Sequence, residues 1–237
     1  MDNQVISFVQ TNWIQIILTI IISYLVGSIS FSIIITRWAR ENEDIRKLGS
    51  GNAGFTNVLR SVGKLPAILT LAGDFAKGIV AVLIGRLIFS GIATGYTNEW
   101  VIVNYGAYLA GFFCVIGHIY PCFFGFKGGK GILTTCAMIF MTDWRVACIV
   151  LGLFLVIVLI TKIVSLGSIA AAFAYPIVTF LFKYFGEYLG NEGTVPFSYV
   201  ISVTILSLII GALALYKHRS NMKRILNGTE KKIKAHR

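Results

Sequence analysis

Long apolar runs dominate this sequence, and each is about as long as a lipid bilayer is thick. Of its 237 residues, 56% are hydrophobic and only 13% are charged, whereas a typical soluble domain is about 25% charged. A helix needs about 20 mostly apolar residues to cross the hydrocarbon core. The sequence therefore predicts an all-α, polytopic membrane protein, with residues 1–237 forming a single integral membrane domain.

Seven segments are expected to span the membrane. The fourth begins at a glycine-rich loop, 124–131, and reaches about residue 141 or 144; the other six are expected at about 13–35, 66–89, 101–119, 146–160, 164–182 and 198–216. The polar segment 37–64 between the first two spans is too long for a tight turn. Within it, residues 55–60 read as a short helix.

The distribution of basic residues predicts the orientation. With seven spans, most lysines and arginines fall on one side, in segment 37–64, in the glycine-rich loop and in the tail that begins at Lys217. The opposite side carries only Arg145 and Lys183. Because Lys and Arg accumulate in cytoplasmic loops, we expect an outer N-terminus and a cytoplasmic C-terminus in the cell membrane. This topology accounts for much of the net charge of +11, so a nucleic-acid partner is not expected.

Two glycine-rich loops lie on the predicted cytoplasmic side. Loop 124–131 holds four glycines and two lysines, and loop 49–54 reads Gly-Ser-Gly-Asn-Ala-Gly. Successive glycine N–H groups can form an anion-binding nest, to which lysine adds positive charge. This composition favours phosphate as the ligand, although Lys130 is followed by glycine and the spacing is not that of a nucleotide P-loop. The alternative is a flexible turn with ordinary cytoplasmic lysines.

Further polar residues are predicted near these loops. Thr56, Asn57 and Arg60 share one helical face. Asp74 and Lys77 lie three residues apart within a predicted span, where charges either pair structurally or face a functional cavity. The same cytoplasmic side carries His118, Ser165 and a tail face with His218, Asn221 and Arg224.

Each of these features also has a simpler interpretation. His118 could be a histidine at a helix end, Ser165 an N-cap, and the tail face a belt for lipid headgroups. Two phosphate-type loops suggest two phosphate groups. The sequence shows neither a metal-ligand cluster nor a G-x-S-x-G nucleophile motif, so neither a metal nor another cofactor is expected.

These motifs resemble those of the bacterial acyl-phosphate-dependent glycerol-3-phosphate acyltransferases. Segment 49–60 resembles the first motif of the family, and Gly117-His118 with Pro121 and segment 126–131 resembles the second. The last blocks are matched by segments 165–168 and 218–224, Gly228 and Glu230. Ala53 stands where many members have proline, and the outer segment 183–196 is longer than expected.

The resemblance implies seven membrane helices and transfer of an acyl group from acyl phosphate to the 1-hydroxyl of glycerol 3-phosphate. The products would be lysophosphatidate and inorganic phosphate, in the first acylation of phospholipid synthesis. The acyl chain would lie in the lipid bilayer. The alternative is a membrane transporter of phosphate or an organophosphate, which would need access from both faces and usually shows a repeat.

The resemblance and the chemistry together suggest roles for individual residues. His118 would act as a base or an orienting group, and three further side chains would stabilise the oxyanion and the departing phosphate; the expected catalytic residues are thus Ser50, Arg60, His118 and Lys130. The expected substrate-binding residues are Gly49, Gly51, Asn52, Thr56, Asn57, Asp74, Lys127, Gly128, Gly129, Gly131, Ser165, His218 and Asn221.

Overall fold

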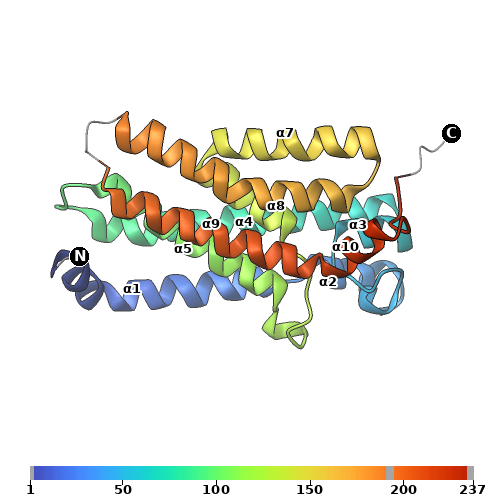
Figure 1. Ribbon diagram of the computed structural model, residues 1–237. Helices are drawn as coiled ribbons and strands as arrows, with labels where there is room; N and C mark the ends of the chain where they lie inside the picture. Colours follow the sequence, from blue (N-terminus) through green and yellow to red (C-terminus); the bar gives the residue numbers. More distant parts are fainter. Residues whose placement is uncertain (1–2, 191–194, 234–237) are drawn as a thin grey trace. The chain divides into compact units, whose positions relative to one another are not determined.

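The computed structural model describes residues 3–190 and 195–233, and all the regular elements in these two ranges are helical (Figure 1). This confirms the predicted all-α class. Six helical stretches in the described chain are long and apolar enough to cross a membrane. The chain forms two compact units, Met1–Thr142 and Asp143–Arg237, which are considered in turn.

The first unit contains the elements that carry both glycine-rich loops. In chain order they are α1 (Asn3–Ser28), α2 (Phe31–Ala39), the 3-10 turn η1 (Ile45–Lys47), α3 (Phe55–Ser61), α4 (Lys64–Ala93), α5 (Glu99–Ile119), the 3-10 turn η2 (Cys122–Phe124) and α6 (Ile132–Thr142). The second unit contains α7 (Trp144–Thr161), α8 (Val164–Leu181), the π-helical η3 (Phe182–Leu189), α9 (Phe197–Lys217) and α10 (Arg219–Leu226).

The first predicted span is broken between α1 and α2, at Ile29 and Ser30. A helix break inside a membrane frees backbone carbonyls that need a new partner. Lys77 of α4 supplies one, because its Nζ donates to the carbonyl oxygen of Ile29 at 2.8 Å. The interruption is thus compatible with a nonpolar surrounding.

Helices α1 and α5 pack closely through small residues. A Cβ on Gly27 would collide with the backbone of Cys114, and one on Gly117 would collide with the backbone of Tyr24 and Ser28. Small residues at such crossings allow two helix backbones to approach each other within a membrane. This agrees with the small-residue character of segment 27–30 in the sequence.

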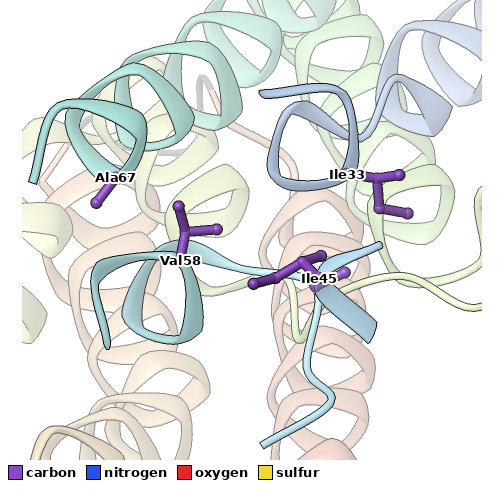
Figure 2. Packing of buried hydrophobic residues seen from close by; sticks show 5 residues of the cluster. Ile33, Ile45, Val58 and Ala67 are labelled. Atoms are coloured by element: carbon purple, nitrogen blue, oxygen red, sulfur yellow. The ribbon is translucent and has the colours of Figure 1, made fainter. Parts of the chain in front are cut away.

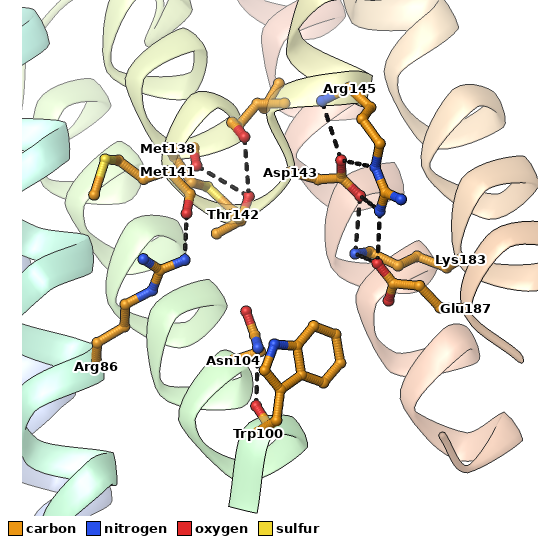
Figure 3. A network of polar contacts seen from close by, with 11 residues as sticks. Arg86, Trp100, Asn104, Met138, Met141, Thr142, Asp143, Arg145, Lys183 and Glu187 are labelled. Atoms are coloured by element: carbon orange, nitrogen blue, oxygen red, sulfur yellow. Dashed lines mark hydrogen bonds and ion pairs between the residues drawn. The ribbon is translucent and has the colours of Figure 1, made fainter. Parts of the chain in front are cut away.

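Helix α6 is shorter than its predicted span. Its 11 residues fall below the length that crosses a bilayer alone. Arg86 of α4 donates to the carbonyl oxygen of Met141, one of the last carbonyls of α6 (Figure 3). A cation at a helix C-terminus satisfies carbonyls and interacts favourably with the helix dipole. Arg86 therefore caps the end of α6.

The polar segment between α2 and α4 is folded onto a small core of its own. Ile33, Ile45, Val58 and Ala67 are fully buried together (Figure 2), and Ala53 joins the same cluster. The predicted short helix at 55–60 is confirmed as α3. This core fixes the first glycine-rich loop, 49–54, against the ends of α2 and α4.

In the second unit, four charges form a network where α7 begins (Figure 3). Lys183 is only 1% exposed, and its Nζ lies 3.0 Å from Asp143 Oδ2 and 2.7 Å from Glu187 Oε1. Arg145 contacts the same two carboxylates. Burial raises the pKa of Asp143, but Arg145 and Lys183 outweigh it and bring the pKa below its ordinary value.

The network involves two cations and two carboxylates, so little net charge is buried. Arg145 and Lys183, which the sequence suggested only as outer-side charges, therefore join the start of α7 to η3. Segment 183–196, expected to be an outer loop, begins as η3 instead. Residues 191–194 of that segment lie outside the described residues.

We predict that Gly117→Ala destabilises the protein, because the added methyl group meets backbone atoms that cannot move aside. Overpacking of this kind costs about 1–3 kcal/mol. Thermal unfolding in detergent measures the effect. Gly152→Ala in α7 is the matched control, since a Cβ there meets nothing within 4 Å. Equal melting temperatures for Gly117→Ala and the wild type would contradict the close α1–α5 crossing.

Candidate active site

The structure brings the two glycine-rich loops of the first unit together. Arg46, which precedes the first loop, donates through Nη1 to the carbonyl oxygens of Phe124 at 2.6 Å and Lys127 at 3.4 Å in the second. A Cβ on Gly129 would meet the carbonyl oxygen of Ala53. Residues about 80 positions apart in the chain thus form one polar surface at the ends of α2, α3 and α5.

Asp44 holds the guanidinium group of Arg46 in place. Its carboxylate accepts from Nε at 3.0 and 3.1 Å and from Nη2 at 2.7 Å. The hydrogen bond from Arg46 is the largest cause that lowers the pKa of Asp44, against a smaller opposing effect of burial. Sequence reasoning counted Arg46 only as a cytoplasmic charge. The signal that could have found it is an acidic residue two positions earlier in a basic segment.

Asn57 determines the conformation of the first loop. Its Oδ1 accepts from the backbone N–H of Ser50 at 2.9 Å, and its Nδ2 donates to the carbonyl oxygens of Ile45 at 3.2 Å and Leu48 at 2.9 Å. A primary amide has two donors, and both are used here. Asn57 therefore positions the first loop, and its predicted contact with substrate stays a prediction.

The first loop presents other predicted residues outward. Gly49 adopts a φ of +56°, and a Cβ there would collide with the side chain of Asn57. Ser50 and Gly51 are exposed and Asn52 is half-buried. On α3, Thr56 is half-buried and Arg60 is exposed.

The second loop does not form the predicted nest at its two central glycines. The N–H of Gly128 donates to the carbonyl oxygen of Ile119, and that of Gly129 donates to the carbonyl oxygen of His118, both at 3.2 Å. Neither glycine has a positive φ. The nest prediction is wrong at these positions because the two N–H groups satisfy the last turn of α5, whose carbonyls lack partners within the helix.

Close packing explains why these positions are glycine. A Cβ on Gly128 would meet the carbonyl oxygen of His118, and one on Gly129 would meet the imidazole Nε2 of His118. Gly131 is buried beside α5 with a φ of +81°. Lys127 is exposed and Lys130 is half-buried at the same surface.

Asp74, Lys77 and His118 form a buried group behind the loops. Asp74 Oδ1 lies 2.9 Å from Lys77 Nζ and 3.5 Å from His118 Nδ1. Asp74 is 1% exposed and His118 is 6% exposed. Asp74 is therefore placed to orient the imidazole through Nδ1. The predicted contact of Asp74 with substrate stays a prediction.

The second unit brings Ser165, Asn221 and Arg224 to one carboxylate. Glu230 Oε1 accepts from Ser165 Oγ and Asn221 Nδ2, both at 2.7 Å, and Oε2 accepts from Arg224 Nε at 2.6 Å. Burial raises the pKa of Glu230, but the hydrogen bonds from Ser165, Arg224 and Asn221 outweigh it and bring the pKa below the usual 4.5.

A backbone carbonyl of α9 holds the ring of His218. His218, which is 2% exposed, donates through Nδ1 to the carbonyl oxygen of Ala214 at 2.8 Å, and this bond fixes its ring. Glu230 was noted in the sequence only as part of a motif. A single acidic residue in a basic tail is the signal that could have identified it as the centre of the cluster.

Fold and site together define an all-helical integral membrane protein with a polar, glycine-rich surface at helix ends. A profile of the family described as glycerol-3-phosphate acyltransferase matches residues 17–228. The chain belongs to this family.

Individual relatives and structures agree with this assignment. Over 217 residues the chain is 39% identical to the glycerol-3-phosphate acyltransferase of Prochlorococcus marinus strain MIT 9312, covering 92% of this chain and 97% of that protein. The corresponding enzyme of Thermoanaerobacter sp. strain X514 is 38% identical, with 92% and 95% covered. A crystal structure of PlsY (YgiH), an integral membrane glycerol 3-phosphate acyltransferase in its glycerol 3-phosphate form, matches with a TM-score of 0.73 at 35% identity, covering 92% of this chain and 96% of that one.

We predict that Glu230→Gln weakens the acid dependence of stability. Because the pKa of Glu230 is lower in the folded state, its contribution is fully present above the ordinary value of 4.5 and is lost as the pH falls through the folded pKa. Melting temperatures between pH 7 and pH 4 should therefore fall less steeply in the variant than in the wild type. Exposed Glu43→Gln is the control and should keep the wild-type slope. An unchanged slope in Glu230→Gln would show that the cluster does not hold an ionised carboxylate.

Proposed function

We propose that this protein transfers an acyl group from acyl phosphate to the 1-hydroxyl of glycerol 3-phosphate and releases lysophosphatidate and inorganic phosphate. This is the first acylation step of phospholipid synthesis. The observation that carries the proposal is the meeting of the two family-type glycine-rich loops at one polar surface. Further support comes from the PlsY structures, which are described as a glycerol 3-phosphate form and a lysophosphatidic acid form of that protein.

The phosphate groups would be held by the residues that the first unit presents at this surface. Ser50 and Arg60 are exposed, and on the second loop Lys127 is exposed and Lys130 is half-buried. Arginine binds phosphate through a planar, two-pronged donor arrangement, and lysine adds a mobile charge. We assign Ser50, Arg60 and Lys130 to the charge that develops on the carbonyl oxygen and the leaving phosphate.

The reaction needs no covalent enzyme intermediate. The glycerol oxygen forms a bond to the acyl carbonyl carbon, the bond from that carbon to the phosphate oxygen breaks, and phosphate leaves with the electron pair. The hydroxyl proton passes to a base. His118 is 6% exposed and held at Nδ1 by Asp74, so we assign it to positioning of the second loop and the proton to the oxygens of the leaving phosphate.

Ser165, His218 and Asn221 of the second unit are proposed to bind glycerol 3-phosphate. Glu230 contacts two of them directly and fixes their donor groups. Because the family profile extends over residues 17–228 and so covers most of both units, we propose that residues 1–237 act as one catalytic domain. The protein requires no cofactor in this scheme.

The proposed topology retains seven crossings. The segment that starts at Gly128 already lies beside the last turn of α5. Gly131 packs near Val115, and Met138 packs near Gly111, so α6 runs antiparallel to α5. The 11 residues of α6 rise ~16 Å, and residues 128–131 add ~13 Å if extended. Together these lengths approach the thickness of the hydrocarbon core, which supports a seventh crossing. With seven crossings, the one-sided distribution of Lys and Arg supports our proposal that the N-terminus lies outside and that the C-terminus and the active surface face the cytoplasm.

The function is tested with the purified protein in detergent or vesicles, incubated with acyl phosphate and radiolabelled glycerol 3-phosphate. We expect labelled lysophosphatidate and an equal amount of inorganic phosphate. Activity with an acyl thioester and none with acyl phosphate would refute the proposed donor. Uptake of intact glycerol 3-phosphate into vesicles without acylation would identify a transporter instead.

We predict that Gly129→Ala raises the KM for glycerol 3-phosphate at least about tenfold. The added methyl group meets the His118 imidazole and the Ala53 carbonyl oxygen, and the two loops must separate to admit it. Gly125→Ala is the control. Its φ of +65° costs roughly 1–2 kcal/mol with a side chain, but a Cβ there meets nothing within 4 Å.

The control should therefore lower the melting temperature and leave KM near the wild-type value. Lys130→Ala should reduce kcat, because it removes charge where phosphate departs. If well-folded Gly129→Ala keeps the wild-type KM, the close contact of the two loops has no part in substrate binding.

A further inference from the structure

We propose that Arg46 is a positioning residue that sets the separation of the two glycine-rich loops and thereby the affinity for the phosphorylated substrate. In this proposal Arg46 does not contact the substrate; it acts by holding the backbones of the two loops. The inference rests on the proposed function for its kinetic consequence, but the structural part of it can be tested without substrate.

The guanidinium group of Arg46 uses its two ends for different partners. Nε and Nη2 face the carboxylate of Asp44 at 2.7–3.1 Å. Nη1 faces the second loop and donates to the carbonyl oxygens of Phe124 and Lys127. The planar guanidinium group thus connects Asp44, which precedes the first loop, to Phe124 and Lys127, which flank the turn in the second loop.

The surrounding residues fix where this group can lie. Asp44 is the N-cap of η1 and accepts from the backbone N–H of Arg46 at 2.9 Å, so it orients the backbone as well as the side chain. Arg37 lies 3.6 Å from the same carboxylate and its guanidinium carbon lies 6.0 Å from the centre of the Phe124 ring. The side chain of Arg46 is 25% exposed, and that of Asp44 is 13% exposed.

Backbone hydrogen bonds and Arg46 hold the second loop from different directions. Gly128 and Gly129 bind the end of α5, whereas Arg46 contacts the preceding stretch from the direction of the first loop. Release of Arg46 would remove both of these hydrogen bonds and leave the ring of Phe124, which packs against the small core and lies near Arg37, as the remaining contact of that stretch with the first loop's side. A displacement of about 1 Å between groups that bind one phosphate weakens several charge-assisted hydrogen bonds at once.

Lysine cannot replace arginine in this arrangement. A single ammonium group has no planar fork that binds a carboxylate on one edge and carbonyl oxygens on the other. Arg46→Lys should therefore behave like Arg46→Gln, although it keeps the charge. This separates positioning from simple electrostatic attraction of an anionic substrate.

The experiment compares Arg46→Gln and Arg46→Lys with Lys47→Gln, which removes the same charge from the adjacent exposed residue. We expect KM for glycerol 3-phosphate to rise about tenfold in both Arg46 variants. Their kcat should stay within about twofold of the wild-type value, and their melting temperature within a few degrees of it. Lys47→Gln should keep the wild-type KM. Asp44→Asn should raise KM as well, and combining it with Arg46→Gln should add little, since both act through one contact.

Hydrogen exchange tests the structural part without substrate. The amides of residues 124–131 should exchange faster in Arg46→Gln than in the wild type, because local opening of that loop becomes easier. Faster exchange in Arg46→Gln, combined with a wild-type protein that lacks acyltransferase activity, would uphold the structural part of the inference and refute the proposed function. The inference is overturned by unchanged exchange, by unchanged KM in folded Arg46→Gln, by full rescue with lysine, or by failure of both Arg46 variants to fold.

Discussion

Backbone carbonyl groups that are freed where helices are interrupted need partners, and cationic side chains supply them in this protein. Lys77 donates to the carbonyl oxygen of Ile29 at the break between α1 and α2, and Arg86 donates to that of Met141 at the end of α6. Arg46 donates to the carbonyl oxygens of Phe124 and Lys127 in the second glycine-rich loop. Without water in the hydrocarbon core, each unsatisfied carbonyl would cost several kcal/mol. The break at Ile29 and the end of α6 therefore rely on Lys77 and Arg86, whereas Arg46 orders a loop at the exposed surface.

Several polar residues of the site act by holding other residues in place. Asn57 uses its amide to shape the Ser50 loop, Asp74 orients His118, and Glu230 holds Ser165 and Asn221. Polar side chains that are fully hydrogen-bonded among themselves have few alternative positions. Rigid placement of the groups that meet substrate follows from these buried partners.

The sequence predicted the long regular parts of the fold and most of the polar residues that matter. Apolar runs of bilayer length identify α4, α5, α7, α8 and α9 because their pattern is local. The break at Ile29 and the shortness of α6 were missed, since each depends on a cation from another helix. The nest at Gly128 and Gly129 was wrongly predicted and the loop contacts of Asn57 were not foreseen for the same reason: the partners lie elsewhere in the chain, and composition alone does not show which N–H groups are already used.

The position of Glu230 has a consequence for biosynthesis. This carboxylate follows the last described membrane-spanning helix, yet it is the acceptor for Ser165, which lies 65 residues earlier in α8. All the described apolar helices precede this acceptor in the chain and are therefore synthesised before it. A chain truncated after α10 would contain every one of them and yet leave Ser165, Asn221 and Arg224 without their common anion.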